Sequence, residues 1–296
     1  MYSDDRLHPF LLERAGVRGA LVRLGPAWRE VAARQDYPPP VRALLGEALA
    51  ASALLTAHVK LQGALSLEFK SDGPLRLPFT ECTDAGRLRG LARMAEGAAP
   101  EAGASLDPAA QPGALLAITL GSVETGRRYQ GLVDVRHGTL AGTLEGYFEQ
   151  SEQLPTRIVL AAGRDTAAGL LLQQLPGSTV ADDDAWPRVG HLTATLQMRE
   201  LLELAPQRLL HRLYHEETPR LFASRALGFG CSCSRVRVEG MLRALGRAEV
   251  QAALDARGGE IEVTCEFCAA RYTLDAVDAE RLLATAPSAP ASSTPH

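Results

Sequence analysis

The sequence predicts an α+β protein, in which an antiparallel-sheet domain with helices is followed by a helical linker and a small cysteine-bearing domain. Three observations lead to this prediction. Most of the strand patterns in the first 178 residues are joined by short turns, which favours antiparallel pairing over a doubly wound parallel sheet. Two amphipathic helical patterns follow. Four of the five cysteines then fall within 38 residues near the C-terminus.

Length and composition are those of an ordinary globular protein, with 296 residues, 46% hydrophobic and 22% charged. The net charge of −4 offers no surplus of positive charge for nucleic acid or an anionic membrane. The longest apolar run, over 48–57, is interrupted by Ser52 and Thr56 and is too short to span a bilayer. No secretory signal is visible after the acidic start. We therefore expect a cytoplasmic protein without a nucleic-acid or membrane partner.

The first domain is expected over residues 1–178, with a strand over 16–24, a helix over 26–34 and a longer helix from about 41 to 58 that follows Pro40. The segment Ser71-Asp72-Gly73-Pro74 is typical of a hairpin turn. A loop is expected over 97–113. Further strands are predicted over 64–70, 75–79, 88–94, 115–120, 129–135, 157–161 and 169–175.

The linker is expected over residues 179–228, with helices over about 191–203 and 206–217. The apolar face of the second helix is formed by Leu209, Leu210, Leu213 and Tyr214. Two such short helices cannot form a core alone and must dock on another part of the protein. Periodicity leaves open whether they dock permanently or in one state only.

The C-terminal domain, expected over 229–284, carries Cys231-x-Cys233, a 31-residue spacer and Cys265-x-x-Cys268. Zn²⁺ prefers four tetrahedral ligands, and four thiolates make a closed site. The second pair lies between strand patterns at 262–264 and 271–274, which predicts a hairpin whose turn is a zinc knuckle. Two short helices are expected over 234–245 and 247–256, and residues 285–296 read as a disordered tail. The spacing thus predicts one Zn²⁺ per chain.

The purpose of this site is open from spacing alone, because a purely structural zinc module has the same pattern. Zinc holds the sulfurs as thiolates, which are the oxidisable form, and each disulfide would remove two ligands. Loss of zinc would withdraw roughly 10–16 kcal/mol of metal-binding free energy from a domain of about 55 residues. A redox switch is therefore chemically feasible.

Two other functions suit these cysteines less well. A nucleic-acid-binding ribbon is disfavoured because residues 229–283 hold seven Arg, no Lys and nine acidic residues. A thiol–disulfide oxidoreductase with Cys265 and Cys268 as its active pair is disfavoured because such pairs usually begin a helix.

The remaining candidate ligands are a histidine pair and a single cysteine. His211 and His215 are four apart, but Arg212 stands where a zinc-protease motif needs Glu, so surface or packing roles are expected. The isolated Cys82 is expected to be a small core or surface residue.

Several motifs in one order resemble the redox-regulated heat-shock protein 33 family, a group of cytosolic holdase chaperones. The cysteine spacing is the most specific of them. The others are Asp36-Tyr37-Pro38 with Pro40-Val41, Tyr129-Gln130-Gly131, Tyr147-Phe148 with Ser151-Glu152-Gln153-Leu154-Pro155-Thr156-Arg157, and Arg212-Leu213-Tyr214-His215-Glu216-Glu217.

This resemblance implies a non-enzymatic, ATP-independent chaperone that is inactive while its reduced cysteines hold zinc. It implies that oxidation forms Cys231–Cys233 and Cys265–Cys268 disulfides, releases zinc, disorders the linker and exposes apolar surface. The implied partners are unfolded or oxidatively damaged client proteins. The implied assembly is a homodimer when oxidised and a monomer when reduced.

Overall fold

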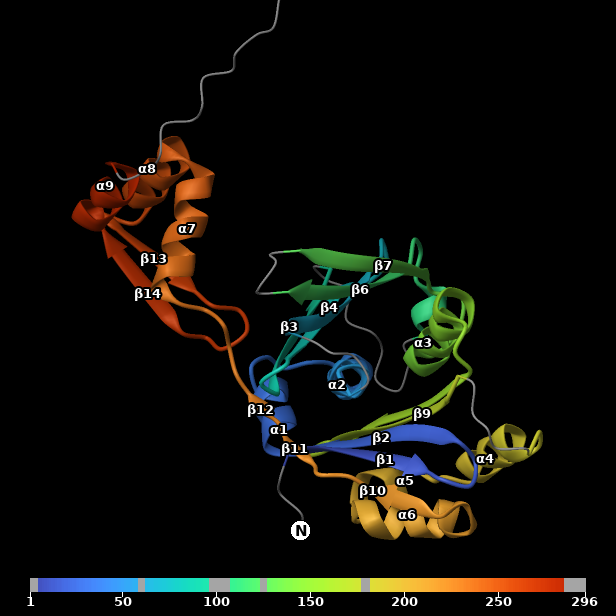
Figure 1. Cartoon of the computed structure of the whole chain (residues 1–296). Coiled ribbons are helices and arrows are strands. Elements are labelled where there is room, and N and C mark those ends of the chain that lie inside the picture. Colours follow the sequence, from blue (N-terminus) through green and yellow to red (C-terminus); the bar gives the residue numbers. More distant parts are fainter. Residues whose placement is uncertain (1–4, 58–61, 96–106, 123–126, 177–181, 285–296) are drawn as a thin grey trace, which may run out of the picture. The chain divides into compact units, whose positions relative to one another are not determined.

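The computed structural model describes residues 5–57, 62–95, 107–122, 127–176 and 182–284. The chain divides into two compact units, Met1–Gly230 and Cys231–His296. The first unit contains two six-stranded sheets, and the second contains a two-stranded sheet with helices (Figure 1). The predicted α+β class is confirmed.

The first sheet has the order β10-β1-β2-β9-β8, with β11 also paired to β1. All of its pairs are antiparallel. Strand β9 reads as a nearly continuous apolar run because both faces of this sheet are covered. The strands are β1 (Arg6–Leu12), β2 (Val17–Leu24), β8 (Thr156–Ala162), β9 (Ala167–Gln174), β10 (Pro219–Leu221) and β11 (Arg225–Ala226).

The second sheet has the order β12-β5-β4-β3-β6-β7 and is antiparallel except for the short β12–β5 pair. Its strand β3 alternates buried and less buried residues, as the sequence pattern predicts. The strands are β3 (Gly63–Lys70), β4 (Leu75–Thr83), β5 (Arg87–Met94), β6 (Leu115–Ser122), β7 (Arg128–Asp134) and β12 (Gly228–Phe229).

Helix α2 (Pro39–Leu55) packs against strands of both sheets and forms the centre of the main core (Figure 1). The short helix α1 (Pro26–Ala32) precedes it and buries Trp28. Close packing depends on Gly46, where an added Cβ would lie 2.5 Å from the Cβ of Ala162 in β8. Twelve of the seventeen residues of α2 are buried, which explains why its apolar stripe is so broad in the sequence.

Helices α4 (Ala185–Ala194), α5 (Met198–Glu203) and α6 (Pro206–Tyr214) lie against the other face of the first sheet. The α6 residues Leu209, Leu210 and Leu213 are each at most 1% exposed. The hydroxyls of Tyr214 and Thr193 lie 2.8 Å apart in this buried layer. The predicted docking face of the second linker helix is therefore fully used.

Polar contacts also attach these helices to the sheet. The guanidinium of Arg23 in β2 donates to the carbonyls of Leu201, Glu203 and Leu204 at the end of α5. Arg188 in α4 pairs with the carboxylate of Glu217, at 2.6 Å. Glu217 is buried, and burying a charge is costly unless it is paired, so this ion pair offsets the cost of placing the carboxylate there.

The second unit consists of α7 (Arg235–Leu245), α8 (Arg247–Ala256), the hairpin β13 (Glu260–Thr264) and β14 (Arg271–Asp275), and α9 (Ala276–Ala284). Its core is small, with eight buried residues among those described: Val238, Leu242, Val250, Leu254, Ile261, Leu274, Ala279 and Leu282. Arg235 links α7 to the rest of this unit by donating to the carbonyl of Thr273 and the carboxylate of Asp278.

Several sequence predictions require correction or extension. The single helix predicted over 191–203 is wrong, because α4 ends at Ala194 and a new helix starts after Gln197, whose amide donates to the Glu200 carboxylate at 3.0 Å. The helix predicted from 41 to 58 begins at Pro39 and ends at Leu55, and the strand predicted over 75–79 extends to Thr83.

Elements that the sequence patterns did not reveal are β1, α3 (Leu140–Tyr147), α9 and the short strands β10, β11 and β12. Part of the loop predicted over 97–113 and the whole tail predicted over 285–296 lie outside the described residues. The described end of that loop contains a 3-10 turn, η1 (Pro108–Ala110).

Candidate metal centre

Two of the four cysteines lie in the segment that leads into α7. Cys231 and Cys233 are half-buried on either side of Ser232. The side chain of Ser234 caps α7 by accepting from the amide of Arg237, and the guanidinium of Arg237 donates back to the hydroxyl of Ser232 at 2.5 Å. The helix start thus holds the Cys-x-Cys segment in place.

The other two cysteines occupy the turn between β13 and β14, as the sequence predicts. The amide of Cys265 donates to the carbonyl of Ala270 at 2.9 Å, and the amide of Ala269 donates to the carbonyl of Cys265 at 2.8 Å. Ala269 adopts a left-handed conformation with φ 58°. This compact turn presents Cys265 and Cys268 on the same side.

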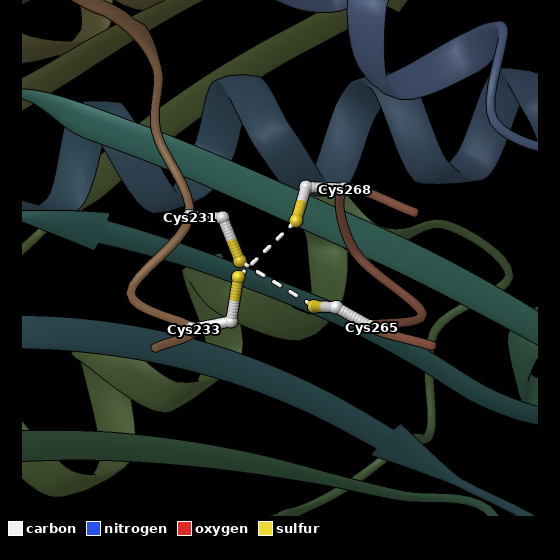
Figure 2. A group of neighbouring side chains, drawn as sticks. All are labelled: Cys231, Cys233, Cys265 and Cys268. Atoms are coloured by element: carbon white, nitrogen blue, oxygen red, sulfur yellow. Dashed lines mark hydrogen bonds between the residues drawn. The ribbon is translucent and has the colours of Figure 1, made fainter. Parts of the chain in front are cut away.

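The four sulfurs converge on one point between these two segments (Figure 2). All four lie within 4.8 Å of one another, with 3.6 Å between Cys231 and Cys265 and 3.2 Å between Cys233 and Cys268. Zinc–sulfur bonds of roughly 2.3 Å in a tetrahedron place the sulfurs roughly 3.8 Å apart. The quartet therefore fits a tetrahedral ion of the size of zinc with little adjustment, and it could hold a metal.

A tyrosine from β14 modifies the chemistry of one thiol. The hydroxyl of Tyr272 donates to Sγ of Cys233 at 3.1 Å. This hydrogen bond lowers the pKa of Cys233 to about 7, because it stabilises the thiolate, and the pKa of Tyr272 rises to about 12. Burial raises the pKa of Cys268 to about 12. A bound cation would draw the protons from all four thiols, so metal binding at this site must depend on pH.

The other candidate ligands lie elsewhere. Cys82 is fully buried in the main core, where burial raises the pKa of its thiol to about 11. His211 and His215 stack on the exposed side of α6 with ring centroids 5.5 Å apart. Within the described ranges, the cysteine quartet is the group of three or more ligand-type side chains that could hold an ion, and neither histidine belongs to it.

Sequence reasoning missed the contacts of Tyr272 and Ser232 with this centre. The strand pattern placed Tyr272 in β14, but its approach to Cys233 follows from the way α7 packs on the hairpin. The position of Cys265 and Cys268 in a turn between strands differs from the helix-start arrangement of thiol–disulfide oxidoreductases. Of the helices in the described ranges, none combines the length and apolar character that a membrane span requires.

Comparison with known proteins agrees with this arrangement. The family model described as Hsp33 protein matches residues 5–275. A 33 kDa chaperonin of Shewanella denitrificans is 44% identical over 93% of this chain and 94% of its own length, and one of Nitrosococcus oceani is 43% identical over 100% of both. The crystal structure of the 33 kDa chaperonin from Thermotoga maritima has the same fold, with a TM-score of 0.81, 21% identity and coverage of 95% of this chain and 98% of that one. The chain therefore belongs to the Hsp33 protein family of chaperones.

Proposed function

We propose that this chain is a redox-regulated, ATP-independent holdase chaperone whose four-cysteine centre binds one Zn²⁺ in the reduced, inactive state. The observation that carries the proposal is the convergence of Cys231, Cys233, Cys265 and Cys268 in a unit with only a small apolar core. A unit of this size gains much of its stability from a bound metal, so the metal controls whether it stays folded.

Oxidation would convert the ligands into disulfides in pairs. Two thiolates give up two electrons to form one sulfur–sulfur bond, and hydrogen peroxide accepts these electrons with two protons to yield two waters. The proposed pairs are Cys231–Cys233 and Cys265–Cys268. The shortest distances between sulfur atoms are those from Cys231 to Cys265 and from Cys233 to Cys268, which are not the proposed pairs. All four sulfurs are nevertheless near enough for either pairing once zinc leaves.

The linker helices provide the second part of the proposal. They cover an apolar face of the first sheet, which includes Leu12, Leu21 and Leu172. Loss of order in the linker would expose this face and the apolar sides of α4 and α6 to unfolded client proteins. Of the two alternatives that periodicity leaves open, we therefore favour docking in the reduced state only.

The proposal also covers the compartment, the oligomeric state and the domain limits of the chain. The oxidised chain would act in the cytoplasm as a homodimer, and the reduced chain would be a monomer. No catalytic turnover is proposed. The domain limits proposed are a chaperone core over 1–178, the linker over 179–228, the zinc domain over 229–284 and a tail over 285–296.

The proposal is tested by following zinc release and client aggregation in parallel. The reduced protein should hold one zinc per chain and leave the aggregation of a heat-denatured client unchanged. Peroxide treatment at raised temperature should release the zinc and suppress aggregation, and peptide mapping should find the two proposed disulfides. The Cys82→Ser variant should behave like the wild type, because Cys82 lies in the main core. Equal suppression by reduced and oxidised protein would reject the switch.

A further inference from the structure

The first unit contains a cleft with a volume of about 420 Å³ between the two six-stranded sheets. Its apolar wall includes Leu65, Ile118 and Leu120 from the second sheet and Leu171 from the first. The volume falls within the range of roughly 300–1,000 Å³ that is typical of small-molecule sites. Among the described residues, the lining includes no cysteine and no part of the linker, so the cleft is formed without the ligands of the proposed redox centre.

Arg18, from β2, carries a positive charge at the edge of the cleft. Its Nε and Nη2 both donate to Oε1 of Gln173, at 3.2 and 2.9 Å, and Gln173 in turn donates to the hydroxyl of Thr156 at 3.1 Å. This neutral relay fixes the direction of the guanidinium. Within the described ranges, no carboxylate lies at ion-pair distance from Arg18, and its Nη1 has no hydrogen-bond acceptor. Partial burial lowers the pKa of Arg18, yet a guanidinium remains protonated at neutral pH.

Another part of the lining comes from an unusual backbone segment. A π-helical turn, η2 (Phe148–Glu152), follows α3, and Gln153 after it has a left-handed φ of 54°. Both features are uncommon in ordinary sequence and are concentrated at functional sites. The segment places Tyr147, Phe148 and Leu154 in the cleft wall, and the hydroxyl of Tyr147 donates to the exposed carboxylate of Glu152 at 2.9 Å.

We propose that this cleft binds a small apolar monocarboxylate, with its hydrocarbon body between the two sheets and its carboxylate on the guanidinium of Arg18. The apolar wall recovers free energy by removing the ligand's hydrocarbon from water. The oriented guanidinium, which has no carboxylate partner among the described residues, offers the planar donor group that suits a carboxylate. Glu152 also lines the cleft and already accepts a hydrogen bond from Tyr147. Its negative charge repels a second anion, which directs the ligand's carboxylate toward Arg18.

The test uses the full-length, reduced, zinc-loaded protein and isothermal titration with octanoate, with 1-octanol as the neutral probe. We expect saturable binding of one octanoate per chain and binding of octanol that is roughly tenfold weaker or more. A peptide, N-acetyl-leucyl-phenylalanine with a free carboxylate, is titrated in parallel to distinguish a peptide end from a fatty acid as the source of the carboxylate.

Variants locate the site. Arg18→Gln should weaken octanoate binding roughly tenfold or more, whereas Arg18→Lys keeps the charge and should weaken it less. Glu152→Gln should leave binding unchanged or tighten it. The matched control is Arg29→Gln, which removes one positive charge from an exposed position on α1 and should have no effect. Circular dichroism checks that each variant is folded.

Three outcomes would overturn the proposal: no saturable binding of octanoate or of the peptide, equal affinity for octanoate and octanol, or full affinity in Arg18→Gln. Weaker octanoate binding in Glu152→Gln would show that Glu152 supports the bound carboxylate rather than repelling it, and would reject the proposed placement of the carboxylate on Arg18. The comparison of octanoate with octanol uses the wild-type chain, so the result does not depend on the folding of any variant.

Discussion

Replacing Leu213 with Ala should loosen the linker helices while leaving every zinc ligand in place. Leu213 lies on α6, is 1% exposed and packs in the cluster that joins α4, α5 and α6 to the first sheet. Truncating a leucine at such a position costs about 2–5 kcal/mol, because apolar burial is lost and a cavity remains. A cost of about 3 kcal/mol raises the ratio of undocked to docked linker roughly 100-fold.

The assay measures the order of the linker helices and the zinc content of the protein independently. Hydrogen exchange should become faster at the amides of α4 to α6 in Leu213→Ala, while zinc content remains at one per chain. If undocking exposes the client-binding surface, the reduced variant should then suppress client aggregation. The matched control is Met198→Ala on α5, where a 52% exposed side chain is shortened and a change within about 0.5 kcal/mol is expected. Faster exchange with zinc retained and no suppression would refute the idea that the docked linker keeps the chaperone inactive.

Three further predictions concern the metal centre and the core. Cys233→Ser should abolish stoichiometric zinc binding and remove exchange protection from α7 to α9, and a retained zinc would contradict the proposed ligand set. Tyr272→Phe should weaken zinc binding roughly tenfold or more, because the hydrogen bond that stabilises the Cys233 thiolate is lost, and an unchanged zinc affinity in competition with a chelator would contradict this. Gly46→Ala should lower thermal stability by about 1–3 kcal/mol through the clash with β8, whereas Gly190→Ala, with nothing within 4 Å, should not.

Much of the fold follows from local patterns in the sequence. The alternation along β3, the turn after it and the Pro-initiated α2 are each visible in the residues themselves. Strand β1 was missed because His8 and Pro9 interrupt its apolar pattern. It is held between β2, the next strand along the chain, and β10, which lies far away in the sequence within the linker. The break between α4 and α5 was missed because the apolar periodicity continues past Gln197.

The two cysteine pairs of the metal centre could be predicted from the sequence, but the contacts around them could not. Cys265 and Cys268 are confined to one turn by their spacing in the chain, and Cys231 and Cys233 are close together because only one residue separates them. Each pair can therefore be recognised from the sequence alone. Their meeting depends on α7 packing on the β13–β14 hairpin. The contact of Tyr272 with Cys233 depends on the same packing, and no sequence signal marks it.

The sequence by itself determined the α+β class, most strand positions and the four-cysteine set, because these depend on side-chain alternation, turn residues and short covalent spacing. Only the tertiary structure decided which face the linker helices cover, which residue shifts the pKa of a cysteine thiol, and that Arg18 lines a cleft with no carboxylate partner among the described residues. Those features depend on contacts between residues far apart in the chain, such as Arg23 with Leu201, and their free energy comes from burial and complementary shape rather than from any local pattern.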